Sequence, residues 1–198
     1  MRIIAGEYRG RTLKAPKGEG TRPTTDRVRE SMMSVVNSAR GGFEGAVVLD
    51  AFAGSGALGF EALSRGARCA HFYECGGEAM RALCANAKTL GLEPRDARIH
   101  RADVLKEPPT YARPPFDLVF LDPPYVYQAE AVLALVAGLR LRGALAQDAL
   151  VVYEPDAASV SSVDEAAKAR DLSIAQRKKY GDTVVDVLRV AASPDAPC

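Results

Sequence analysis

Apolar positions along the chain form short runs of strand length that alternate with stretches of helical periodicity. The strand-length runs cover residues 46–51, 69–74, 97–101, 116–121 and 150–154. The helical stretches cover residues 57–65, 78–90, 129–139 and 159–169. Strands that alternate with helices are typical of βαβ units, so the pattern predicts an α/β fold with a mostly parallel sheet covered on both faces.

Both ends of the chain depart from this alternation. Residues 2–4 and 11–13 flank a glycine-containing stretch and predict a short hairpin, after which a Pro/Gly-rich loop leads to a helix that starts near residues 24–26. Residues 172–178 and 183–190 predict a closing antiparallel hairpin. We therefore expect an N-terminal extension over residues 1–42, one α/β domain over residues 43–191, and a frayed tail over residues 192–198.

Composition excludes several classes of protein. The chain has 198 residues, of which 47% are hydrophobic and 26% are charged, which excludes a disordered chain. No apolar run approaches the ~18 residues of a membrane span, and the first residues lack the apolar stretch of a signal peptide. The four cysteines form no CxxC pair and predict no disulfide framework. We expect a cytoplasmic protein without a membrane partner.

Charge is balanced over the whole chain but not along it. Residues 1–40 contain nine Lys or Arg against four Asp or Glu, whereas residues 41–198 carry a net charge of −4. A basic segment on a slightly acidic body favours a polyanionic partner such as RNA. A solvated basic surface without a partner is the alternative that charge alone leaves open.

A glycine turn follows the first strand of the α/β domain. Asp50 ends that strand, and Gly54, Gly56 and Gly59 follow it in a spacing that permits a tight turn and close backbone approach. Glu74 ends the second strand, where a carboxylate is suited to hold ribose hydroxyls. The combination predicts nucleotide binding, with Phe52 and Ser55 of the same turn beside the ligand.

The same pattern also fits NAD, so the type of nucleotide needs a further argument. Asp50 would place a carboxylate close to a pyrophosphate, which is repulsive. S-adenosyl-L-methionine has no phosphate, and its amino group and sulfonium favour a nearby anion. Asp103, after the third strand, is placed to accept a hydrogen bond from an adenine amine, although a plain turn cap explains it equally well.

The tetrapeptide Asp122-Pro-Pro-Tyr125 follows the strand at residues 116–121. Two prolines end a strand because they donate no backbone hydrogen bond. The Asp122 carboxylate and the carbonyl of Asp122 or Pro123 are placed to hold both hydrogens of an exocyclic amine, with Tyr125 stacked on its ring. Two such acceptors localise the amine lone pair and aim it at a methyl donor. The base must leave its helical stack, or already lie in a loop, to reach this site.

These motifs resemble those of a known family. Gly54-Ser-Gly56 with Asp122–Tyr125 is similar to class I S-adenosylmethionine-dependent amino-methyltransferases. The extension, with Arg2-Ile-Ile-Ala-Gly6 and Thr21-Arg-Pro-Thr24, and the late Lys179-Tyr-Gly-Asp-Thr183 resemble the small-subunit (16S) rRNA guanine-N2 methyltransferases of the RsmD type. Met33-Ser34 and Cys75-Gly76 depart from the pattern of that family.

The resemblance implies a Rossmann-like fold with a seven-stranded sheet, and methylation of the guanine at position 966 (standard rRNA numbering) in 16S rRNA of the small ribosomal subunit. It also implies the site residues. Catalysis would involve Asp122, Pro123 and Tyr125. The cofactor would be held by Asp50, Phe52, Gly54, Ser55, Gly56, Glu74, Asp103 and Asp122. RNA would be contacted by Arg9, Arg11, Arg22, Thr24, Arg27 and Arg29.

Other functions remain open at this point. Residue chemistry does not separate guanine N2 from adenine N6 in DNA or RNA, and an NAD-dependent oxidoreductase or a non-catalytic ribosome assembly factor could share the fold. Cys69, His71 and Cys75 alternate on one strand, but side chains ~6.6 Å apart along a strand are too spread for one zinc ion. We expect no metal and a monomer.

Overall fold

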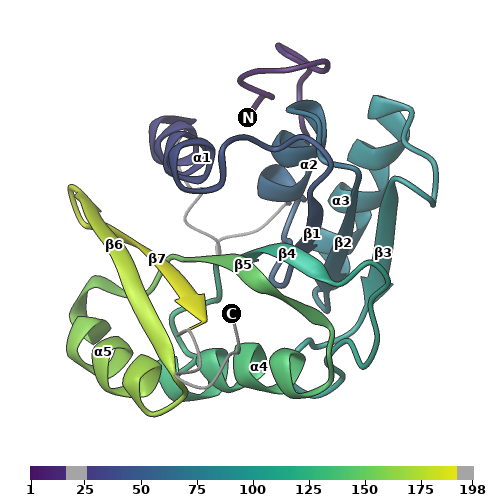
Figure 1. Cartoon of the computed structure of the whole chain (residues 1–198). Helices are drawn as coiled ribbons and strands as arrows, with labels where there is room; N and C mark the ends of the chain where they lie inside the picture. Colours follow the sequence, from purple (N-terminus) through teal and green to yellow (C-terminus); the bar gives the residue numbers. More distant parts are fainter. Residues whose placement is uncertain (17–25, 191–198) are drawn as a thin grey trace.

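The computed structural model describes residues 1–16 and 26–190, which form a sheet between two helical layers (Figure 1). The strands are β1 (Val47–Asp50), β2 (Cys69–Glu74), β3 (Ala97–Arg101), β4 (Phe116–Leu121), β5 (Leu145–Tyr153), β6 (Leu172–Tyr180) and β7 (Thr183–Val190). The helices are α1 (Asp26–Arg40), α2 (Ala57–Ser64), α3 (Gly77–Leu90), α4 (Ala129–Leu141), the 3₁₀ turn η1 (Ala157–Ser159) and α5 (Val160–Lys168).

The described strands form one seven-stranded sheet in the order β3-β2-β1-β4-β5-β7-β6. The pairs β1–β2, β2–β3, β1–β4 and β4–β5 are parallel, while β7 is antiparallel to both β5 and β6. The α/β prediction, with a parallel sheet and a closing hairpin, is therefore confirmed. Because the strand order reverses beside β1 and β4, ligands are expected at the carboxyl ends of these two strands.

Two hydrophobic clusters hold the layers together. Helices α1, α2 and α3 pack on one face through residues such as Met32, Phe60 and Leu83. Helices α4 and α5 cover the other face through residues such as Leu133 and Val163. Strands β1, β2 and β4 are buried along most of their length, as their continuous hydrophobic runs predicted, whereas β3 at the edge of the sheet is partly exposed.

The N-terminal extension shares this core. Ile3 and Leu13 are buried in the cluster that contains Phe60 of α2 and Leu118 of β4. The predicted hairpin is small, with one antiparallel bridge between Arg2 and Thr12 and backbone hydrogen bonds on both sides of it. The predicted loop before α1 and the predicted tail at residues 192–198 lie mostly or wholly outside the described residues.

One strand differs clearly from its prediction. β5 begins at Leu145, whereas the apolar run predicted a start at residue 150. Polar residues at positions 147 and 148 are exposed where the strand extends past the core, so hydrophobicity did not reveal that part. No helix within residues 1–16 and 26–190 is long and apolar enough to span a membrane.

Candidate active site at the carboxyl ends of the parallel strands

The glycine turn (residues 51–56) lies between β1 and α2. Ala53 N donates to the Tyr73 carbonyl at 2.9 Å, which fixes the turn against the end of β2. Gly56 has φ of 84°, and a Cβ there would lie 2.3 Å from the Phe60 ring and 2.5 Å from Leu83. Only glycine fits this position, because both the backbone conformation and the packing exclude a side chain. The backbone of the turn is thus held close to the carboxyl ends of β1 and β2, where a ligand is expected.

Gly59 has a different role, because its space is filled by the protein itself. A Cβ at Gly59 would lie 2.3 Å from the Phe72 ring and 3.1 Å from Asp50 Oδ2. Gly59 N also donates to Asp50 Oδ2 at 2.9 Å. The third glycine therefore allows α2 to pack on the sheet and orients the Asp50 carboxylate.

Asp50 is 2% exposed, and burial raises the pKa of its carboxyl group to about 7. The hydrogen bond from Gly59 lowers this pKa, while the nearby charges of Asp122 and Glu74 raise it. The negative charges at the ends of β2 and β4 thus both act on the carboxyl group of Asp50. A cationic ligand beside Asp50 would relieve this repulsion.

Glu74 joins two backbone segments. Its Oε2 accepts a hydrogen bond from Gly54 N at 2.8 Å, and its Oε1 accepts one from Gly76 N at 2.6 Å. The side chain therefore ties the glycine turn to the start of α3. The predicted contact with ribose hydroxyls would use the remaining lone pairs of an acid that already has a structural role.

Asp103 follows β3 and caps its own turn. Its Oδ1 accepts from Leu105 N at 3.0 Å, and its Oδ2 lies 3.3 Å from Lys106 Nζ. Ala102 N donates to the Glu74 carbonyl at 3.1 Å, which places Asp103 next to the end of β2. The structure thus shows Asp103 as the cap of its own turn, and its contact with an adenine amine stays a prediction.

Residues Asp122–Tyr125 follow β4 directly beside the glycine turn. Ala51 N donates to the Phe120 carbonyl at 3.1 Å, so the two segments are adjacent at the backbone. Asp122 is partly exposed, Pro123 is buried, and Tyr125 is 52% exposed. An exposed tyrosine on a loop fixed by buried neighbours is suited to stack on an incoming ring.

A second aromatic residue of this loop was missed by the sequence analysis. The Tyr127 ring lies 5.9 Å from the Phe52 ring of the glycine turn, and Tyr127 N donates to the Pro124 carbonyl at 3.0 Å. This contact joins the two loops at the site. The spacing Tyr125-x-Tyr127 was the available signal, since both tyrosines follow the same strand end.

The basic residues of the extension have different environments. Arg9 and Arg11 are exposed, and Arg11 Nη1 donates to the Thr89 carbonyl at 3.3 Å. Arg22, Thr24 and the side chain of Arg27 lie outside the described residues. RNA contact by these five residues stays a prediction.

The prediction that Arg29 contacts RNA is wrong, because Arg29 is 1% exposed. Its Nη2 donates to the Arg2 carbonyl at 2.6 Å, and its Nε lies 3.9 Å from Glu61 Oε2. Glu61, fully buried on α2, also accepts hydrogen bonds from Ile4 N and Ala5 N at 2.9 and 3.1 Å. Arg29 and Glu61 thus fix the extension to the α/β core. A single charged residue in the mostly apolar helix ALGFEALS was the missed signal.

No group of three or more His, Cys, Asp or Glu side chains within residues 1–16 and 26–190 could hold a metal ion. The donor set instead fits S-adenosylmethionine. The glycine backbone, the Asp50 carboxyl group with Asp122 and Glu74 near it, and the adjacent exposed Tyr125 match a ligand that combines a nucleoside with cationic groups. Asp50, Glu74 and Asp103 would hold it, together with the glycine turn.

The fold and this arrangement define a Rossmann-like methyltransferase. The family model described as "Conserved hypothetical protein 95" matches residues 1–189, and the chain belongs to this family, the RsmD family. Similar proteins include the YlbH protein of Bacillus subtilis, 36% identical over 96% of this chain and 98% of that protein. "Ribosomal RNA small subunit methyltransferase D" of Haemophilus influenzae is 41% identical over 69% of this chain and 70% of its own length. The solved structure of yhhF from Escherichia coli has a TM-score of 0.79 and 32% identity, covering 98% of this chain and 99% of that one.

Proposed function

We propose that this protein transfers a methyl group from S-adenosyl-L-methionine to the exocyclic N2 amine of one guanine, position 966, in 16S rRNA of the small ribosomal subunit. The observation that carries the proposal is the adjacency of Asp122–Tyr125 to the glycine turn, held by the Ala51–Phe120 backbone hydrogen bond of 3.1 Å. Residues 122–125 would hold the amine, and the glycine turn would hold the cofactor. Because the two segments lie at neighbouring strand ends, the nucleophile and the methyl donor would be brought together.

Asp50 and Glu74 provide the negative charge that attracts the cofactor. When bound, S-adenosylmethionine supplies an electrophilic methyl group on a positively charged sulfur. The ionised form of Asp50, which burial disfavours, would be stabilised by that positive charge. Glu74 presents its carboxylate beside Gly54 and Gly76, where ribose hydroxyls would donate to it.

Asp122 has the central role in catalysis. Its carboxylate would accept one hydrogen of the guanine amine while a backbone carbonyl of Asp122 or Pro123 accepts the other. These two bonds would favour a pyramidal nitrogen and aim its lone pair at the methyl group that the bound cofactor would supply, with the sulfur of the cofactor as the leaving group. Methylation leaves an extra proton on the nitrogen, and Asp122 is the acidic side chain of this loop placed to receive it. Tyr125 would stack on the base and keep it out of its helix.

The RNA substrate is supported by two independent features. The extension carries a net charge of +5 over residues 1–40, and its exposed Arg9 and Arg11 lie on the outside of the fold. The relative from Haemophilus influenzae is named for the small ribosomal subunit RNA. The guanine and its position rest on the resemblance of the extension and the late hairpin to the RsmD type. We propose that the protein acts as a monomer in the cytoplasm.

The test is methyl transfer to small ribosomal subunits that lack their native methylation. We expect methyl-labelled S-adenosylmethionine to give N2-methylguanosine at one position of the digested rRNA. Asp122→Asn should lower the rate about a hundredfold or more while cofactor affinity changes little. Tyr125→Ala should raise KM about tenfold through lost stacking, and Tyr125→Phe should restore it. Glu130→Gln, an exposed change near the same loop, is the matched control.

Each other outcome identifies a different function. Label on adenine would retain the chemistry and refute the guanine assignment. Cofactor binding without label on any subunit RNA would favour a non-catalytic assembly factor. Tight NADH binding would favour an oxidoreductase. Transfer by Asp122→Asn within a factor of a few of the wild-type rate would refute the role of Asp122.

A further inference from the structure

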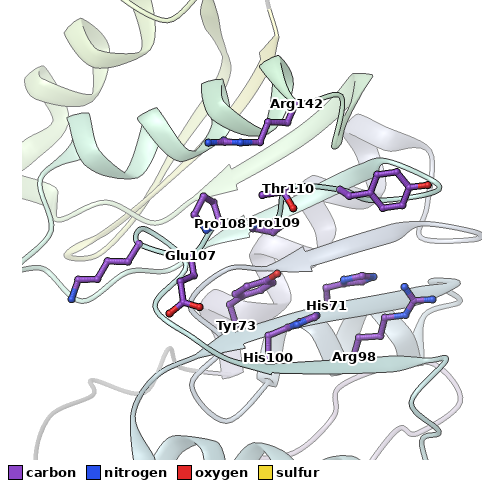
Figure 2. A pocket seen from close by; sticks show the side chains of 11 residues that line it. His71, Tyr73, Arg98, His100, Glu107, Pro108, Pro109, Thr110 and Arg142 are labelled. Atoms are coloured by element: carbon purple, nitrogen blue, oxygen red, sulfur yellow. The ribbon is translucent and has the colours of Figure 1, made fainter.

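A groove of about 580 Å³ lies away from the glycine turn, between the β2–β3 end of the sheet and the loop that follows β3. Figure 2 shows His71, Tyr73, His100 and Arg98 on the sheet side, facing Pro108, Pro109, Thr110 and Arg142 across the groove. The face opposite α2 and α3 is covered by α4 and α5 further along the sheet, whereas here a loop takes the place of a helix. The groove therefore exists because a loop, and not a helix, follows β3 on this face of the sheet.

Aromatic rings form the floor of this groove. The rings of Tyr73 and His100 lie 4.5 Å apart at 15°, and those of His71 and His100 lie 5.6 Å apart at 18°. Tyr111 on the loop is 66% exposed, and the Arg113 guanidinium lies 5.3 Å from the centre of its ring. The floor rings stack on one another, and Tyr73 and His71 are each only 8% exposed, so the exposed Tyr111 provides the ring face on which a nucleobase can stack.

The charge of the lining is complementary to phosphate. Arg98, Lys106 and Arg142 line the groove together with one acid, Glu107. Lys106 lies 3.3 Å from the Asp103 carboxylate. Within the described part of the chain, neither Arg98 nor Arg142 has an acidic partner within 4.0 Å. Two exposed guanidinium groups are thus available to contact phosphate oxygens on either side of the floor.

The two histidines of the floor are neutral at neutral pH. Burial and the charge of Arg98 lower the pKa of both rings, that of His71 to about 4. A neutral imidazole carries one donor and one acceptor, as a base edge does. His100 Nε2 is buried and has no hydrogen-bond partner among the described residues, so the floor of the groove holds an unsatisfied polar atom.

This groove is separate from the proposed catalytic site. None of its lining residues belongs to the glycine turn or to residues 122–125. His71 packs edge-on against Phe116, at the amino end of β4, whereas Asp122 follows the carboxyl end of the same strand. A ligand in the groove would thus contact the protein at a second position.

We propose that this groove binds an unpaired nucleotide of the RNA substrate, with its base stacked on Tyr111 and its phosphate on Arg98 and Arg142. The proposal rests on the proposed function only in taking RNA as the substrate. A second contact point would give affinity and register to a large RNA substrate without taking part in methyl transfer.

The experiment measures binding of a fluorescently labelled single-stranded oligouridylate by anisotropy at several salt concentrations. Tyr111→Ala should weaken binding about tenfold, and Tyr111→Phe should restore it because the ring is retained. The double change Arg98→Ala with Arg142→Ala should reduce the slope of log Kd against log salt by about 1.4, which is about 0.7 for each lost phosphate contact. Arg95→Ala, an exposed arginine on the loop before β3, is the matched control and should behave as wild type.

Several outcomes would overturn the proposal. These are no measurable binding by the wild type, equal affinities and salt slopes in all variants, or equal loss in Arg95→Ala. Competition by AMP as strong as that by the oligomer would assign the groove to a free mononucleotide. Competition by polyglutamate would assign it to an acidic peptide.

Methyl transfer to small subunits, measured on the same variants, separates this proposal from the proposed function. We expect KM for subunits to rise and kcat to stay unchanged in Tyr111→Ala. Wild-type protein that binds the oligomer through the groove but transfers no methyl group would refute the function and leave the groove standing. Full methyl transfer, with oligomer binding that is unchanged in the groove variants, would support the proposed function and refute the groove as a binding site.

Discussion

Asn86 and Lys14 exchange a pair of hydrogen bonds across 72 residues of sequence. Lys14 N donates to Asn86 Oδ1 at 2.8 Å, and Asn86 Nδ2 donates to the Lys14 carbonyl at 3.0 Å. The same Nδ2 donates to the Ser55 carbonyl at 2.9 Å. One amide that is 1% exposed thus joins the N-terminal extension, α3 and the glycine turn.

Asn86→Ala should therefore destabilise the protein and weaken cofactor binding. The change leaves backbone groups of Lys14 and Ser55 without their partner, which costs about 1–3 kcal/mol in the free energy of unfolding. Urea denaturation measures that loss, and titration with S-adenosylmethionine should give a Kd several-fold higher. Thr89→Ala, an exposed change on the same helix, should alter neither value. Equal stability of Asn86→Ala and wild type would contradict the structural role.

The sequence was sufficient for those parts of the fold that depend on local pattern. The bounds of β2, β3, β4 and β7 agree with their hydrophobic runs, and the topology then brings Asp50, Glu74 and Asp122 to one edge of the sheet. The sequence was not sufficient for polar residues that become buried against a segment distant in the chain. Arginine is usually a surface residue, and only the packing of Arg29 against residues 1–5 and Glu61 shows that it is internal.

Arg29→Ala should mainly affect folding. Glu61 keeps its ion pair with Arg65 at 2.8 Å, but the change removes a fully buried side chain and the donor to the Arg2 carbonyl, which together cost about 2–5 kcal/mol. Thermal or urea unfolding measures this change. Arg9→Ala, which alters an exposed arginine, should leave stability within about 0.5 kcal/mol of wild type and instead weaken RNA binding. If Arg29→Ala folded with wild-type stability and lost only RNA affinity, the assignment of Arg29 to the core would be wrong.

Glu74→Gln should impair cofactor binding although it removes only one charge. The carboxylate accepts from Gly54 N and Gly76 N at once, whereas a glutamine side chain offers one oxygen and one NH₂ group. One backbone N–H would then face a donor, and the glycine turn would shift. We expect the Kd for S-adenosylmethionine to rise about tenfold or more, measured by calorimetry. Glu78→Gln, on the exposed face of the first turn of α3, is the control and should bind normally.

Asp50 should make stability and cofactor binding depend on pH in opposite directions. Its pKa in the folded protein is raised from 3.8 to about 7, so between these values the native state retains a proton that the unfolded chain has released. The free energy of unfolding should therefore fall as pH rises from about 4 to about 7, by up to a few kcal/mol, since one pKa unit corresponds to about 1.4 kcal/mol.

Asp50→Asn isolates this effect, because asparagine keeps an oxygen for the Gly59 N–H and does not titrate. The stability of the variant relative to wild type should rise between pH 4 and pH 7, and titration of His71 or His100 cancels in that difference. Wild-type affinity for the cationic cofactor should increase from pH 6 to pH 8 as Asp50 ionises, whereas the variant should bind weakly with a flat profile. Parallel profiles for the two proteins, in stability and in affinity, would show that Asp50 does not titrate in this range.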